Sequence, residues 1–108
     1  MMRPMIAANW KMHKTVPEAI ALAKRLRDAF PEPGDRDIVI APPFTALGFV
    51  SAILKGSPVR LSAQNMHWEK SGAYTGEISA DMLSTLACRY VILARQQRRT
   101  YFGETEEI

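Results

Sequence analysis

Short apolar runs alternate with segments of helical periodicity along the chain. Four runs have the length and composition of buried strands, at residues 4–9, 37–42, 59–64 and 90–94. Between them, apolar residues recur every three or four positions, which is typical of amphipathic helices. Strands that alternate with helices in this way predict parallel strands joined by right-handed crossovers, so we expect an α/β fold.

The expected helices have recognisable starts and stops. A capping box at Thr15–Glu18, with a proline in the first turn, predicts the start of the first helix, and the prolines after Phe30 end it. Serine, threonine and glycine signals place the other two helices between Thr45 and Gly56 and between Ser79 and Cys88. The acidic segment Thr105–Glu107 is predicted to open a fourth helix.

Composition is that of an ordinary globular domain. Of the 108 residues, 47% are hydrophobic and 23% are charged, which argues against a disordered chain. No linker or low-complexity segment divides the sequence, so we expect one domain over residues 1–108. A domain of this size buries only about 60–70% of its unfolded surface, so assembly with another copy would help its core.

Charge and hydropathy exclude several classes of partner. The formal charge of +3 comes from basic residues scattered among acidic ones, without a basic stripe interleaved with aromatic residues, so we expect no binding to nucleic acid. The apolar run Met5–Ala8 is far too short for a signal segment or a membrane span, so we expect no membrane binding. A lone cysteine, Cys88, fits a buried thiol in a reducing, cytoplasmic environment.

Five blocks of the sequence resemble the triosephosphate isomerase family, in the family's order. They are Ala8–Met12, Ile40–Phe44, Ala63–Asn65, Gly72–Ser79 and Tyr90–Thr105. The resemblance covers essentially all of the chain but only the first part of a (β/α)8 barrel, which typically has about 250 residues. It implies a parallel half of a TIM barrel with about four strands and three helices, and no cofactor.

The last block departs from the family pattern at the catalytic position. In the family, the four residues after the fourth strand follow a pattern that resembles Gly-His-Ser-Glu, whereas this sequence has Ala94-Arg95-Gln96-Gln97. In the isomerase reaction of that family, a neutral His polarises the substrate carbonyl and a Glu moves the proton. Arg95 stays charged and cannot take the part of that His. In addition, no segment of these 108 residues resembles the family's block that carries the Glu base. We therefore expect little isomerase activity, with a weak or split isomerase as the alternative.

The resemblance also implies a substrate-binding pair, Asn9 and Lys11, at the end of the first strand, where barrel enzymes place their sites. With Arg95 at the mouth, this pair would suit a phosphate or another anion. The competing interpretation is a solvated lysine beside a turn-forming asparagine. His13 and His67 are expected to be loop residues rather than catalytic bases, and with one cysteine they make no metal-binding cluster.

Four strands cannot close an eight-stranded barrel. Inner-face residues would then face solvent, and two strand edges would lack partners; the candidates are Ile6, Ala8, Val39, Ala41, Leu61, Ala63, Val91 and Leu93. We therefore expect a homo-oligomer, through the sheet edges or through the loop at residues 65–78. A weaker alternative is docking onto a complete isomerase subunit. The resemblance implies interface roles for Gln64, Asn65, Tyr74, Thr75, Gly76, Glu77, Arg98 and Glu104.

Overall fold

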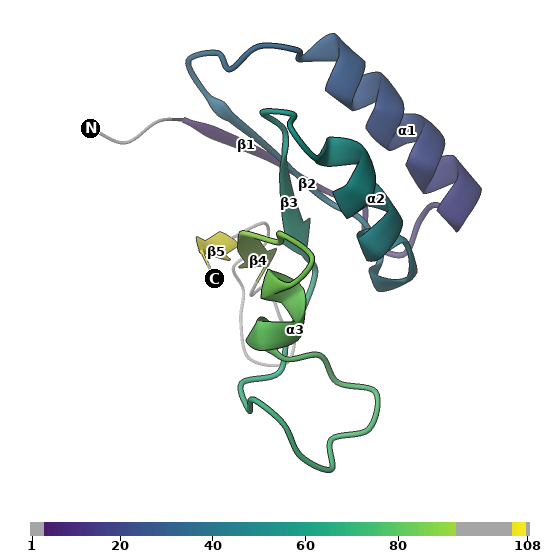
Figure 1. Ribbon diagram of the computed structural model, residues 1–108, viewed down its shortest axis with the longest axis vertical. Helices are drawn as coiled ribbons and strands as arrows, with labels where there is room; N and C mark the ends of the chain where they lie inside the picture. Colours follow the sequence, from purple (N-terminus) through teal and green to yellow (C-terminus); the bar gives the residue numbers. More distant parts are fainter. Residues whose placement is uncertain (1–3, 93–104, 108) are drawn as a thin grey trace.

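The computed structural model describes residues 4–92 and 105–107, in which five strands form one sheet in the order of the chain (Figure 1). The elements are β1 (Met5–Asn9), α1 (Val16–Ala29), β2 (Asp37–Ala41), the 3-10 turn η1 (Phe44–Ala46), α2 (Leu47–Leu54), β3 (Arg60–Ala63), α3 (Ala80–Ser84), β4 (Tyr90–Ile92) and β5 (Thr105–Glu107). Neighbours from β1 to β4 are parallel, whereas β5 is antiparallel to β4. Four parallel strands with three helices confirm the expected α/β half-barrel.

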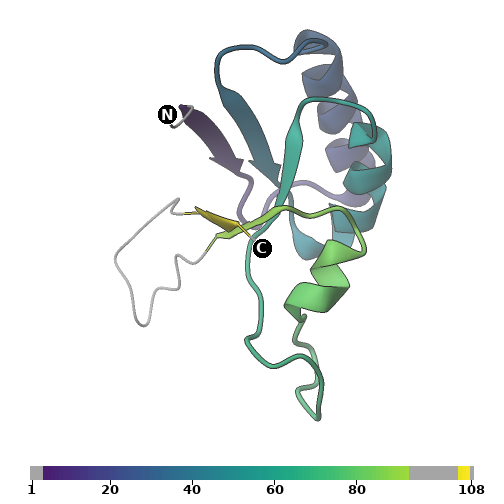
Figure 2. The same ribbon diagram turned by 60° about the vertical axis from the view of Figure 1, so that its left-hand side comes forward.

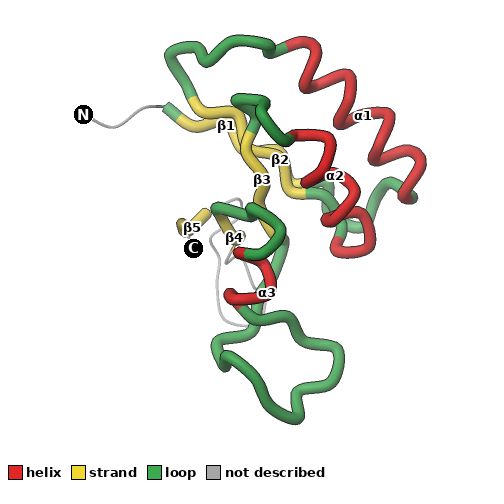
Figure 3. Tube along the Cα trace, in the orientation of Figure 1, coloured by secondary structure: helices red, strands yellow, loops and turns green. Residues whose placement is uncertain are grey.

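The helices cover one face of the sheet, as the turned view in Figure 2 and the coloured trace in Figure 3 show. Strand register decides which side chains meet them. Ile40 pairs with Leu61 and Ala63 with Val91, and all four belong to the buried cluster that also holds Leu47 and other helix residues. Asn9 pairs with Ala41 on the opposite, open face. This alternation follows from the two-residue period of a strand.

The first helix begins as the sequence predicts. The N–H of Thr15 donates to Glu18 Oε1 at 2.9 Å, which is the backbone half of a capping box. The helix then buries Ala19 and Ala23 completely. None of the helices in residues 4–92 is long and apolar enough to cross a membrane.

Two expectations about helices are wrong. Thr105–Glu107 opens no helix but forms β5, which pairs with β4, because an unpaired strand edge offers backbone groups that another strand satisfies. The third helix ends at Ser84 rather than at Cys88. Its continuation is broken at Ala87, whose φ of 58° lies in the left-handed region that ends helices.

Most of the residues expected to face solvent are buried instead. Leu61, Ala63 and Val91 lie in the core on the helix side, with 2–3% of their surface exposed. Val39 and Ala41 lie on the open face, yet they are only 1% and 2% exposed. A sheet that coils toward a barrel brings the inner side chains of its strands against one another. The open face is therefore less accessible than the sequence suggests.

The two candidates on the first strand, Ile6 and Ala8, are exposed, as expected. Ile6 is 48% exposed, Met5 is 41% exposed and Ala8 is also exposed. Ile6 and Ala8 pair with residues of the helix-facing side, but no helix among the described residues buries them. Within residues 4–92 and 105–107, β1 pairs with β2 alone, whereas β4 has partners on both sides. One predicted open edge is therefore present at β1; Leu93 lies outside the described residues.

Candidate functional site

The carboxyl ends of the first three strands are joined by hydrogen bonds at one carbonyl oxygen. Ala41 O, at the end of β2, accepts from the N–H of Trp10 at 3.0 Å and from Gln64 Nε2 at 2.9 Å. Trp10 follows β1 and Gln64 follows β3. Because a carbonyl oxygen has two lone pairs, both bonds are accommodated. The strand exits, where ligands bind in parallel α/β sheets, are held together here.

Lys11 sits at this edge with an unusual backbone conformation. Its φ of 55° lies in the left-handed region, which costs a residue other than glycine about 1–2 kcal/mol. Its N–H donates to Asn9 Oδ1 at 2.8 Å, and its carbonyl oxygen accepts from Gln64 Nε2 at 2.9 Å. A hydrogen bond contributes about 0.5–1.5 kcal/mol net, so the two bonds are comparable with the conformational cost.

The structure thus brings together two of the three predicted anion-binding residues. Asn9 is half-buried and fixes the backbone of Lys11, while the Lys11 side chain is exposed. The asparagine has the turn-forming role that the plainer interpretation gave it, and it performs this role at the strand exit where a site is expected. Arg95, the third residue, lies outside the described residues, as do Arg98 and Glu104.

The role of Gln64 was missed by sequence reasoning, which assigned it to an interface. Its side-chain amide is occupied within its own chain, by the carbonyl oxygens of Lys11 and Ala41. These acceptors are 53 and 23 residues away in the sequence. No local pattern predicts contacts over such distances; the only available signal was an amide residue directly after a strand.

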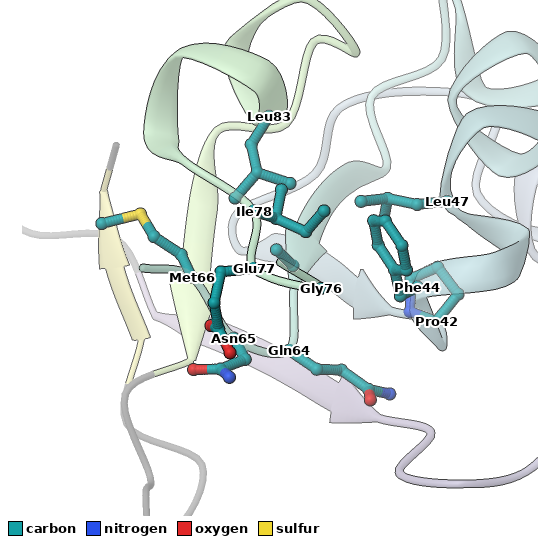
Figure 4. Close-up of a pocket in the computed structure, with 11 residues that line it drawn as sticks. Pro42, Phe44, Leu47, Gln64, Asn65, Met66, Gly76, Glu77, Ile78 and Leu83 are labelled. Atoms are coloured by element: carbon teal, nitrogen blue, oxygen red, sulfur yellow. The ribbon is translucent and has the colours of Figure 1, made fainter. Parts of the chain in front are cut away.

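A small pocket of about 210 Å³ lies next to Gln64, between the start of α2 and the loop after β3 (Figure 4). Most of its lining residues are apolar, with Phe44 and Leu47 on one side and Ile78 and Leu83 across from them. Clefts that hold small-molecule ligands usually measure about 300–1,000 Å³. The pocket suits a single inserted side chain better than a substrate.

The loop over residues 64–79 folds around His67. The His67 ring stacks on Trp68, with ring centres 4.3 Å apart, and lies 4.4 Å from the Tyr74 ring. The backbone N–H of His67 donates to Ile78 O at 2.6 Å, and the ring Nδ1 of His67 lies 3.9 Å from Glu77 Oε1. These contacts close the loop at its base, and they make His67 a packed loop residue.

Several residues predicted to form an interface lie on this loop or beside the pocket. Gln64, Asn65, Gly76 and Glu77 line the pocket. Tyr74 is 45% exposed despite its contact with His67, and Thr75 is exposed. Trp68, which sequence reasoning did not select, is 70% exposed. The loop therefore has exposed aromatic surface.

Cys88 has the buried position that the sequence predicts. Its side chain is 3% exposed, and burial raises the pKa of the thiol to about 11. The Sγ atom lies 3.5 Å from Tyr90 O. At neutral pH the group is a thiol packed in the core rather than a nucleophile.

Comparisons with known proteins agree with this geometry. The sequence profile described as "Triosephosphate isomerase" matches residues 4–108. The chain is 51% identical to the triosephosphate isomerase of Herpetosiphon aurantiacus over 108 residues, which are 100% of this chain and 43% of that protein. It is 50% identical to that of Chloroflexus aurantiacus, covering 95% of this chain and 41% of the relative. The chain thus spans less than half the length of these curated relatives.

A solved structure gives the same picture in three dimensions. The crystal structure of triosephosphate isomerase from Bartonella henselae superimposes with a TM-score of 0.75 at 35% sequence identity. The superposition covers 94% of this chain and 41% of that one.

Proposed function

The chain belongs to the triosephosphate isomerase family, and on that premise we propose that residues 1–108 act as a self-associating half-barrel without appreciable isomerase activity of their own. The observation that carries the proposal is the exposed first strand. Met5 and Ile6 are 41% and 48% exposed beside a strand edge that no described strand pairs. Apolar surface next to unpaired backbone groups favours association.

The expected lack of activity rests on the sequence. Arg95 stands where the family's electrophilic His is expected, and these 108 residues contain no segment resembling the block that carries the general base. Each such acid–base group typically contributes about 10²–10⁴-fold to the rate. Losing both leaves binding and positioning as the remaining sources of catalysis.

A coupled isomerase assay on the pure chain tests this part of the proposal. We expect no turnover above the blank, and little gain from Arg95→His, because the base is still absent. Clear turnover by the unaltered chain that disappears in Lys11→Ala would overturn the proposal in favour of a working isomerase site.

Size-exclusion chromatography with light scattering tests the association. We expect at least a dimer for the unaltered chain and a lower mass for Ile6→Lys, which places a charge on the exposed strand. Phe49→Lys is the matched control, because Phe49 is a similarly exposed apolar residue, at 54%, on α2. A monodisperse, folded monomer of the unaltered chain would contradict self-association. Dissociation by Tyr74→Lys but not by Ile6→Lys would move the interface to the loop.

A second candidate function is binding of phosphate or a phosphorylated small molecule at Asn9 and Lys11, with Arg95 as a further contact. It is supported by the fixed backbone of Lys11, which two side chains hold at the strand exit. An exposed ammonium group on a restrained backbone loses less conformational freedom on binding than one on a mobile loop.

Titration with inorganic phosphate, followed by calorimetry or NMR, tests anion binding. We expect millimolar binding that Lys11→Ala weakens. Lys14→Ala is a matched control, since Lys14 is also an exposed lysine with positive φ, at 84°. Equal loss in both variants would indicate attraction by overall charge, and no binding at millimolar phosphate would contradict this second function.

A further inference from the structure

The structure assigns Gln64 the role of a positioning residue for Lys11: its amide holds the Lys11 backbone in the left-handed conformation from which the ammonium group reaches an anion. This inference rests on the anion-binding function proposed for Asn9 and Lys11. Gln64 does not touch the anion itself, because both donors of its amide group already bind backbone carbonyls.

The contacts fit an amide and neither of the two side chains closest to it in shape, glutamate and leucine. The amide group of glutamine has two N–H donors, and Nε2 lies 2.9 Å from the carbonyl oxygens of both Lys11 and Ala41. Glutamate has the same shape but no donor when ionised, and leucine has neither donor nor acceptor. Either change would leave two carbonyl oxygens without this partner.

Gln64 binds the backbone of Lys11, which has an unfavourable conformation. The Lys11 backbone, with a φ of 55°, is in a region that L-residues rarely adopt. Asn9 Oδ1 restrains the N–H side of this residue, and Gln64 restrains its carbonyl side. Since Ala41 O also accepts from Trp10 N–H, Gln64 connects the Lys11 loop to a fixed point on β2. Without it, Lys11 can relax toward an ordinary conformation and its Cα–Cβ bond turns away.

The first experiment compares the unaltered chain with Gln64→Glu and Gln64→Leu. Sulfate is the probe, because its charge does not change between pH 4 and pH 8. At pH 8 we expect both variants to bind sulfate about tenfold more weakly, as for the loss of a strong hydrogen bond. Lowering the pH should partly restore binding in Gln64→Glu, because a protonated carboxyl regains one donor, which can bind Lys11 O, and should not restore it in Gln64→Leu.

A second readout follows the Lys11 backbone without any anion. The three-bond coupling between the amide and α hydrogens of Lys11 reports φ. We expect the unaltered chain to give the coupling for φ near 55° and Gln64→Leu to give a different coupling. Gln64→Glu should differ at pH 8 and return toward the coupling of the unaltered chain at low pH. Lys55→Gln, which removes one positive charge at the end of α2, should leave the coupling and sulfate binding almost unchanged.

The outcomes separate the two hypotheses. If the unaltered chain does not bind sulfate, the anion-binding function fails, and the coupling measurement still decides the role of Gln64. If the chain binds sulfate and both variants bind it equally well with the same Lys11 coupling, the positioning role is wrong. Should Gln64→Glu fail to fold at pH 8, Gln64→Leu and the low-pH measurement of Gln64→Glu decide the question.

Discussion

The backbone N–H of Lys11 donates to Asn9 Oδ1 at 2.8 Å, and this bond closes a turn in which Lys11 has a φ of 55°. The turn lies directly after β1, where a parallel strand delivers its side chains to the mouth of a barrel. A short polar side chain that caps the backbone two residues later is the usual way in which asparagine stabilises such a turn.

Replacing Lys11 should separate the cost of its conformation from the value of its charge. Glycine adopts positive φ without strain, whereas alanine does not, so we expect Lys11→Gly to be about 1 kcal/mol more stable than Lys11→Ala. Urea unfolding of the two variants measures this difference. Equal stabilities would mean that the left-handed conformation is absent in solution. Both variants should lose the anion affinity that the Lys11 side chain supplies.

Acidification should weaken the start of α1. The hydrogen bond from the Thr15 backbone N–H lowers the pKa of Glu18 below its usual value near 4.5. A carboxylate whose pKa is lowered in the folded state adds stability. This stability is present at pH values above the usual pKa and is lost as the pH falls through the lowered pKa. Thermal unfolding at pH 7 and pH 3 should therefore show a smaller acid loss for Glu18→Gln than for the unaltered chain.

The control for this prediction is Glu69→Gln, which removes an exposed carboxylate in the loop after β3. It should leave the acid loss of stability as it is in the unaltered chain. If Glu18→Gln and Glu69→Gln respond alike, the capping box is not the source of the pH dependence.

Sequence reasoning succeeded where local physics decides the structure. The apolar runs gave all four parallel strands, and the capping box at Thr15 placed the start of α1. It failed at Thr105–Glu107, because acidic residues suit a helix start and tolerate an edge strand equally well. Pairing with β4 is a contact between distant parts of the fold, and no local pattern encodes it.

The candidate site was likewise predicted only where local sequence determines the structure. Asn9 and Lys11 could be selected from the sequence, because they stand at a strand exit within a recognisable block. The amide of Gln64 could not be assigned, since its acceptors, Lys11 O and Ala41 O, come close only when three strands are paired. Exposure of the inner face was overestimated for Val39 because counting strands does not reveal how strongly the sheet coils.

Cys88 should resist alkylation while the chain is folded. Its pKa of about 11 is two units above the usual value of 9.0, so at pH 8 its thiolate fraction is reduced about 100-fold, and burial hinders access further. Iodoacetamide labelling followed by mass spectrometry should be at least about 100-fold slower in buffer than in concentrated urea.

An exposed cysteine provides the comparison for this measurement. Ser71→Cys in a Cys88→Ala background places a thiol on the exposed loop, and its labelling rate should hardly change with urea. Rapid labelling of Cys88 in buffer would show that the β4 end of the core opens readily.

The aromatic cluster of the loop gives the last prediction. His67 stacks on Trp68 and contacts the Tyr74 ring, while its Nε2 atom is buried with no hydrogen-bond partner among the described residues. A phenylalanine keeps the ring contacts and removes the unpaired nitrogen, a change that is often neutral or stabilising. It also removes the contact between Nδ1 and Glu77, which is long and partly exposed and therefore contributes little. We therefore expect His67→Phe to be at least as stable as the unaltered chain, and His67→Ala to lose about 1 kcal/mol or more.

Urea unfolding of both variants, with near-ultraviolet circular dichroism to follow Trp68, checks this expectation. His13→Phe is the control, because His13 is exposed and makes no ring contact among the described residues, and its stability should stay near that of the unaltered chain. If His67→Phe loses as much stability as His67→Ala, a polar contact of the imidazole stabilises the loop, either that of Nδ1 with Glu77 or that of Nε2 with a bound water. The polar contact, rather than ring stacking, would then hold the loop closed.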